Sequence, residues 1–239
     1  MKKYRHQHGL FIVEGKKMVN EAITSGWDVQ TLIVREDMVE KFDGLYFDIE
    51  VCFAGQQDFA RLSSQPSPEG VLAVVKFPAP DFCETCQPEI LPEGPGFILD
   101  AIQDPGNLGT IMRIADWFGF PRVIFGLGTS DLLNPRSLRS TMGAVFRVNV
   151  MYVENIAKLI STAPDRVLIA DLEGQPLENI TWQGNEFVVI GNEANGVSEE
   201  IRALAGLRKV SIPGEGGAES LNAGVSAGIF AWNLRYSRK

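Results

Sequence analysis

Short apolar runs alternate with amphipathic helical stretches along the last two thirds of the chain. The apolar runs predict strands at 96–100, 122–126, 148–153, 166–171, 186–191 and 209–212. The helical stretches lie between or after them, at about 107–118, 134–141, 154–162, 198–205 and 220–236. Some of the strands are apolar at every position, which is typical of a strand that is buried on both faces. We therefore predict an α/β fold with a doubly wound parallel sheet.

The first third of the chain shows the same alternation on a smaller scale. A helical pattern (Met18, Val19, Ala22, Ile23) ends at Gly26. Strand-like runs follow at 29–34, 49–53 and 71–77, with a short helix-like stretch at 37–42.

A Pro-rich stretch separates the two parts. Residues 78–95 contain five prolines among acidic residues, a composition that suits neither a helix nor a central strand. We predict a small α/β domain at 1–77, an extended acidic linker at 78–95 and a larger α/β domain at 96–239.

Composition excludes several classes of protein. The chain has 239 residues, of which 45% are hydrophobic and 22% are charged, so it is neither disordered nor collagen-like. No secretory signal and no apolar run of about 20 residues is visible, and three cysteines cannot all pair. We expect a cytoplasmic protein without a membrane span. Cys83 and Cys86 form a single pair without a second one nearby, so no metal site is expected.

The net charge of −8 argues at first against a nucleic-acid partner. The acidic residues, however, are concentrated in the middle of the chain and the linker. Residues 1–20 and 201–239 each carry a net charge of +4, and residues 110–153 carry +3. A phosphate-binding face needs local rather than global positive charge, although ordinary solvated faces and basic tails would give the same pattern.

Three loops at the predicted carboxyl ends of the strands have unusual sequences. The first contains Asn107 and leads into a helix that carries Arg113, and the second runs through Gly191, Asn192 and Glu193. The third, 212–222, opens the last helix. Because ligands of parallel sheets bind at these strand ends, the loops predict a ligand pocket.

The first and third loops also have a purely structural interpretation. Asn107 and Ser220 are good helix N-caps, and Arg113 is spaced from Asp116 as in a surface ion pair. The Walker phosphate loop, the G-x-G-x-x-G fingerprint and the G-x-S-x-G nucleophile motif are all absent. With only two histidines in the chain, acid–base catalysis by histidine is not expected.

Together the loops resemble the signature blocks of the SpoU/TrmH branch of the SPOUT RNA methyltransferases. The similarity lies at 99–119, 191–196 and 212–222, and residues 139–144 are similar to the Arg-x-Ser-x-Gly-Ala stretch of the family. Residues 5–15 are similar to the start of a small substrate-binding domain that often precedes these enzymes. The chain departs from the family pattern at Gly214, Ala223 and Gly224.

The resemblance implies a C-terminal trefoil knot, a homodimer and S-adenosylmethionine as cofactor. It implies methyl transfer to a ribose 2′-hydroxyl of RNA, with rRNA favoured over tRNA. The cofactor would be bound at Gly191, Asn192, Ile212, Pro213 and Leu221. The catalytic residues would be Arg113, Asn107, Glu193, Ser220 and Asn222. The expected RNA contacts are Lys2, Lys3, Arg5, Lys16 and Arg139.

Arg113 would orient an RNA phosphate and stabilise charge, because a guanidinium stays protonated and therefore cannot accept a proton as a general base does. Two alternatives stay open: a knotted RNA- or ribosome-binding protein without turnover, and a methyltransferase that acts on a small molecule.

Overall fold

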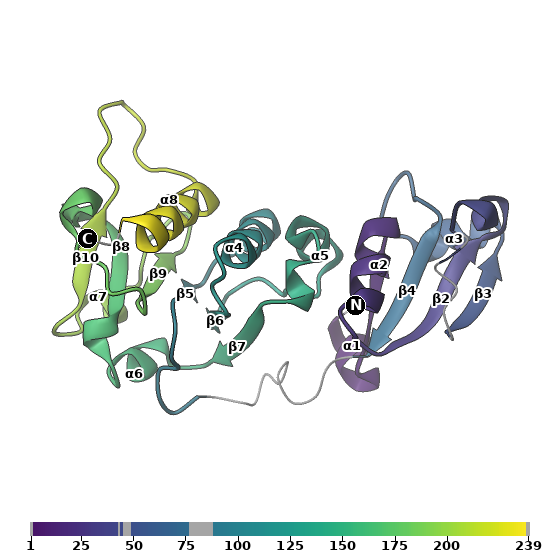
Figure 1. Cartoon of the computed structure of the whole chain (residues 1–239), viewed down its shortest axis with the longest axis horizontal. Coiled ribbons are helices and arrows are strands. Elements are labelled where there is room, and N and C mark those ends of the chain that lie inside the picture. The colour runs from purple at the N-terminus through teal and green to yellow at the C-terminus, as the bar shows by residue number, and fades with distance from the viewer. Residues whose placement is uncertain (1, 43, 45–48, 77–87, 238–239) are drawn as a thin grey trace.

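The computed structural model describes residues 2–42, 44, 49–76 and 88–237. They form two units, each built on its own β-sheet (Figure 1). We call residues 2–76 the first unit and residues 88–237 the second unit. Cys83, Cys86 and most of the predicted linker lie outside the described residues.

The first unit is a four-stranded mixed sheet in the order β1-β4-β2-β3. Strand β4 is antiparallel to both of its neighbours, whereas β2 and β3 are parallel. The strands are β1 (Leu10–Glu14), β2 (Val29–Arg35), β3 (Glu50–Ala54) and β4 (Val71–Lys76). The helices are α1 (Lys2–His8), α2 (Lys16–Thr24), the 3₁₀ helix η1 (Glu36–Phe42) and α3 (Gln56–Leu62).

The sequence pattern predicted β2, β3, β4 and α2 but missed α1, β1 and α3. Strand β1 has only five residues, and its partner β4 lies about 60 residues further along the chain, so the pairing has no local signal. Helix α1 has no apolar periodicity to reveal it.

The second unit is a six-stranded parallel sheet in the order β10-β8-β9-β5-β6-β7 (Figure 1), which confirms the predicted parallel α/β sheet. Its strands are β5 (Gly96–Asp100), β6 (Arg122–Gly126), β7 (Asn149–Val153), β8 (Val167–Pro176), β9 (Phe187–Gly191) and β10 (Arg208–Ser211).

Helices cover both faces of this sheet (Figure 1). The helices on one face are α4 (Pro105–Trp117), α5 (Pro135–Thr141) and α8 (Ala223–Tyr236). Those on the other face are α6 (Ile156–Ile160) and α7 (Glu199–Arg202). Short 3₁₀ helices are η2 (Ala144–Phe146), η3 (Pro164–Arg166) and η4 (Leu177–Asn179). Phe97 and Leu99 point into one core and Ile98 into the other, which explains why the strands are apolar at every position.

Two helix starts differ from the prediction. Helix α4 begins at Pro105 because Asp104 is its N-cap and accepts from the Asn107 N–H at 2.9 Å. Helix α8 begins at Ala223 because Asn222 is its N-cap and accepts from the Gly224 N–H at 2.9 Å. The interpretation of Asn107 and Ser220 as caps is therefore wrong, which leaves the Asn107 side chain available for other contacts.

The two units share one hydrophobic core. Trp27 of the first unit packs edge-on against Phe146 of the second, with ring centroids 5.0 Å apart. Arg147 links the units as well, since it pairs with Glu21 of α2 and, at 2.8 Å, with Asp116 of α4. Among the described residues, no helix is long and apolar enough to cross a membrane.

Candidate active site

Glu193 ties the loop after β9 to the start of α4. Its Oε2 accepts from the backbone N–H of Gln103 and its Oε1 from that of Asp104, both at 3.2 Å. The same Oε1 accepts from the Asn107 side-chain amide at 2.9 Å. One carboxylate therefore joins two of the three loops that the sequence singled out.

Asn222 brings in the third loop. Its side-chain amide donates to the Asn107 Oδ1 at 2.8 Å, while its own Oδ1 caps α8. We call this chain of side chains the Glu193–Asn107–Asn222 cluster. The predicted catalytic residues Asn107, Glu193 and Asn222 thus meet at the carboxyl end of the sheet, where parallel α/β folds bind their ligands.

The cluster keeps Glu193 ionised. Partial burial by itself would raise the pKa of this carboxyl. The hydrogen bond from the Asn107 amide and those from backbone N–H groups outweigh the burial, so the pKa lies below its ordinary value of 4.5. At neutral pH Glu193 is a fixed negative charge whose oxygens already accept hydrogen bonds.

The loop after β9 is tightly folded around Gly191 and Asn192. A Cβ at Gly191 would lie 2.2 Å from backbone atoms of Gly196 and Val197, so only glycine fits there. The Asn192 Oδ1 accepts from two backbone N–H groups of its own loop, and its amide donates to the Ala101 carbonyl at 2.9 Å. Gly191 and Asn192 therefore fix the shape of the loop after β9.

The loop from Ile212 to Leu221 is open, and its glycines leave its backbone groups accessible. A Cβ at Gly214, Gly216 or Gly217 would meet nothing within 4 Å. Among the described residues, no N–H group of 214–221 donates to another backbone carbonyl. Donors of this kind, next to a polar cluster and the half-exposed Leu221, suit a ligand that main-chain groups hold.

Arg113 and Ser220 do not join the cluster. Arg113 is exposed on α4, six residues after Asn107, which is about 9 Å along the helix axis. The expected surface pair of Arg113 with Asp116 does not form, because Asp116 binds Arg147. Arg113 has no ion pair with any described residue. Ser220 is exposed in the open loop.

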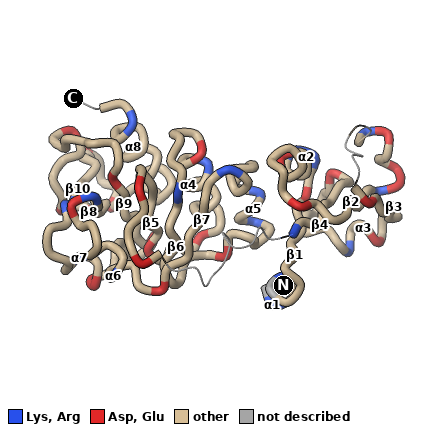
Figure 2. Tube along the Cα trace, turned by 60° about the horizontal axis from the view of Figure 1, so that its bottom comes forward, with Lys and Arg blue, Asp and Glu red and all other residues tan. Residues whose placement is uncertain are grey.

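The five basic residues predicted to contact RNA are in different environments. Lys3 and Lys16 are exposed, whereas Arg5 pairs with Asp131. Arg139 donates to the Ser64 Oγ at 2.8 Å, and the side chain of Lys2 lies outside the described part. Figure 2 shows basic positions on and beside α5.

The sequence reasoning missed the role of Asp104. This residue caps α4 and also pairs with Arg136 of α5 at 3.3 Å, which ties α5 to the site. Its position just before Pro105 could have revealed the cap, since proline favours the first helical position. The described residues contain no group of His, Cys, Asp and Glu that could hold a metal ion.

Known proteins match both units of the chain. Residues 96–232 match the SpoU rRNA Methylase family, and residues 1–73 match the MRM3-like substrate binding domain. Over 98% of its length the chain is 30% identical to the 23S rRNA (guanosine(2553)-2′-O)-methyltransferase RlmP of Bacillus subtilis, of which the match covers 92%.

Solved structures show the same fold. The AdoMet-bound rRNA methyltransferase of Sinorhizobium meliloti is 27% identical with a TM-score of 0.82, over 99% of this chain and 91% of that one. The SpoU methyltransferase AviRb of Streptomyces viridochromogenes, in complex with AdoMet, is 25% identical with a TM-score of 0.83, over 99% and 93%. On these grounds the chain belongs to the SpoU rRNA methylase family.

Proposed function

We propose that this protein transfers a methyl group from S-adenosylmethionine to a ribose 2′-hydroxyl of ribosomal RNA. The observation that carries the proposal is the Glu193–Asn107–Asn222 cluster, which joins three strand-end loops in a chain of the SpoU family. The named activity of the Bacillus subtilis relative and the AdoMet bound in two similar structures support the same reaction.

The residues at the strand ends fit this cofactor. Gly191 and Asn192 would form one wall of its pocket, and the backbone groups of Ile212, Pro213 and Leu221 would hold it from the open loop. When bound, S-adenosylmethionine supplies an electrophilic methyl group on a sulfonium sulfur.

The cluster positions the reactants rather than removing a proton. Glu193 already accepts from three donors and is held ionised, so its role is to fix the loops. Asn107, Asn222 and the nearby Ser220 offer neutral polar groups that would orient the ribose. Arg113, an exposed cation without an ion pair among the described residues, would bind the adjoining RNA phosphate and stabilise developing charge.

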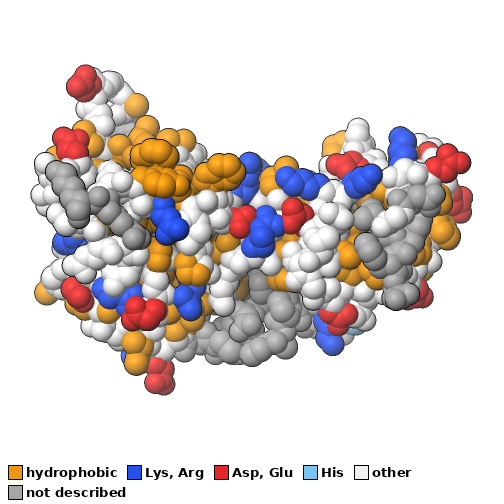
Figure 3. All heavy atoms as spheres, viewed as in Figure 1, with side chains coloured by type: hydrophobic (Ala, Val, Ile, Leu, Met, Phe, Trp, Pro, Cys, Tyr) orange, Lys and Arg blue, Asp and Glu red, His pale blue; other side chains and the backbone are white. Residues whose placement is uncertain are grey.

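An exposed apolar face supports a homodimer. Trp117 of α4 is 84% exposed, and Val225, Trp232 and Tyr236 of α8 are 52%, 58% and 60% exposed. Figure 3 shows apolar side chains gathered over α8 and α4. The α8 residues follow helical spacing and thus form one stripe, and Trp117 follows Arg113 by one helical turn. A second copy packed on this face would cover the tryptophans and place Arg113 at the interface.

A knot and a division into two domains complete the proposal. Strand β10 lies at one edge of the sheet, yet α8 packs against α4 near its middle. Residues 212–222 therefore cross the carboxyl ends of β8 and β9, a path that a C-terminal trefoil knot requires. The boundaries we propose are 1–77 for the RNA-binding domain, 78–95 for the linker and 96–239 for the catalytic domain.

Methyl transfer to purified RNA tests the function. We expect labelled methyl groups from S-adenosylmethionine to enter unmodified 23S rRNA as alkali-stable 2′-O-methylnucleotides. Total tRNA serves as the alternative substrate, and the Glu193→Ala variant as the negative control. Cofactor binding without transfer to either RNA would instead support the binding-protein alternative.

A further inference from the structure

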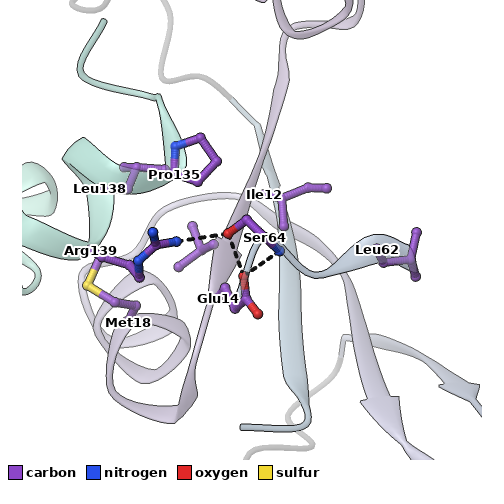
Figure 4. A pocket seen from close by; sticks show the side chains of 9 residues that line it. Ile12, Glu14, Met18, Leu62, Ser64, Pro135, Leu138 and Arg139 are labelled. Atoms are coloured by element: carbon purple, nitrogen blue, oxygen red, sulfur yellow. Dashed lines mark hydrogen bonds between the residues drawn. The ribbon is translucent and has the colours of Figure 1, made fainter. Parts of the chain in front are cut away.

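A pocket of about 190 Å³ lies where the first unit meets α5. Strand β1, helix α2 and the end of α3 line it from one side and α5 from the other (Figure 4). Ile12 and Leu62, both close to half exposed, and Pro135 of α5 give it an apolar rim. Apolar walls on two sides suit a flat ligand that stacks between them.

The polar side of the pocket pairs a carboxylate with a guanidinium. Glu14 accepts from the Ser64 N–H at 3.1 Å and from the Ser64 hydroxyl at 2.8 Å, and also from the Ser63 hydroxyl. Arg139 donates to the same Ser64 Oγ at 2.8 Å (Figure 4). Of the five N–H donors of the Arg139 guanidinium, only one binds a described residue, namely Ser64. Among the described residues, only Ser63 donates to the Glu14 Oε1.

This pair of groups matches the edge of a guanine. Guanine presents N1–H and N2–H donors side by side, next to the acceptors O6 and N7. A carboxylate accepts from the first pair, and an arginine donates to the second. Adenine reverses this pattern at its Watson–Crick edge, where it would turn an acceptor toward Glu14.

The pocket is also close to the proposed active site. Arg136, one turn before Arg139 on α5, pairs with Asp104 at the start of α4. Because none of the cluster residues lines the pocket, its ligand is distinct from the nucleotide that is methylated.

We propose that this pocket binds an unpaired guanine of the RNA substrate, with the remaining acceptor position on the Glu14 Oε1 taking the N1–H and Arg139 donating to O6 and N7. The identity of the RNA as substrate rests on the proposed function. A base held here would set which ribose reaches the cofactor, so the first unit would contribute to sequence selectivity.

Binding of mononucleotides to the full-length protein tests this inference. Guanosine 5′-monophosphate and adenosine 5′-monophosphate are titrated by calorimetry with S-adenosylmethionine at saturation, so that neither purine occupies the cofactor site. We expect the guanine nucleotide to bind at least about 10-fold more tightly, which is about 1.4 kcal/mol. Equal affinities, or no saturable binding of the guanine nucleotide, would refute the proposal.

Variants assign the binding to this pocket. Glu14→Gln should abolish the preference for guanine, and Leu62→Ala, at a half-exposed rim position, should weaken both nucleotides about 3-fold or more. The control is Glu69→Gln, which alters a carboxylate outside the pocket that accepts from the Lys16 N–H at 2.9 Å, and it should bind as wild type. A preference unchanged in Glu14→Gln would reject the site.

Failure of this inference is distinguishable from failure of the proposed function. Wild-type protein that methylates rRNA but does not prefer guanine would reject the pocket and leave the function standing. A guanine preference without methyl transfer would reject the function. Thermal unfolding of Glu14→Gln shows whether this variant is folded. If it is not, the weaker nucleotide binding expected of Leu62→Ala still tests the pocket.

Discussion

Replacing Glu193 with alanine removes an acceptor that three donors share. The donors are the backbone N–H groups of Gln103 and Asp104 and the side-chain amide of Asn107. A buried hydrogen bond to a charged group contributes about 1.5–3 kcal/mol. Glu193 is exposed, so in the variant water can bind the three donors in its place. We therefore reduce the contribution of each hydrogen bond to about 0.5 kcal/mol. The free energy of unfolding should fall by about 1–2 kcal/mol, which lowers Tm by about 3–6 °C for a chain of this length.

Calorimetric unfolding at neutral pH measures this change, with Glu178→Ala as control because Glu178 is exposed and has no ion pair with a described residue. Glu193→Gln keeps an acceptor and should lie between the wild type and Glu193→Ala. Methyl transfer should fall about 100-fold in Glu193→Ala, since misplacement by about 1 Å can have that effect.

The pH dependence checks the cause of the stabilisation. Because the folded protein lowers the pKa of Glu193 below 4.5, ionised Glu193 stabilises the fold above that pH. The contribution is lost as the pH falls through the lowered pKa. The Tm difference between wild type and Glu193→Ala should therefore be constant near neutral pH and shrink in acid. An unchanged Tm in the variant at pH 7, or a difference that grows on acidification, would refute the reasoning.

Three further substitutions test other parts of the site. Arg113→Ala should lower kcat for methyl transfer at least about 100-fold, while calorimetry should find the Kd for S-adenosylmethionine within about 3-fold of wild type. An equal loss of cofactor affinity would contradict the proposal that Arg113 binds an RNA phosphate. Trp232→Glu should convert a dimer into a monomer in sedimentation velocity at micromolar concentration, and a wild-type monomer would reject the interface. Gly191→Ala should destabilise the fold by about 2 kcal/mol or more in denaturant titrations, because its Cβ would lie 2.2 Å from the backbone of Gly196; wild-type stability would show that the loop relaxes freely.

The sequence predicted the second unit more closely than the first. Strands β5 and β6 agree with the prediction residue for residue, because buried parallel strands are apolar at every position and end at polar loops. One error is the end of β8, which runs to Pro176 instead of 171. Two others are helix starts, where one capping side chain decides the boundary. Asp104 caps α4 in place of Asn107, and Asn222 caps α8 in place of Ser220. Which residue becomes the cap depends on how the chain turns before each helix.

The candidate site, too, was predicted from the sequence only in part. Residue types and order along the chain identified Asn107, Glu193 and Asn222 and the family that they resemble. They could not show that Asn107 lies between the other two and donates to one while it accepts from the other. That arrangement requires three loops, which are far apart in the sequence, to meet at one sheet edge.

By itself the sequence determined which segments are buried strands and which loops carry polar residues, because apolar periodicity and glycine spacing are local properties. Only the tertiary structure decided which charges are free. Arg5 pairs with Asp131 and Arg147 with Glu21, each 126 residues away in the sequence, whereas Arg113 keeps its charge exposed. The pocket at Glu14 and Arg139 likewise exists only because the first unit docks on α5, a contact between distant segments that no local pattern encodes.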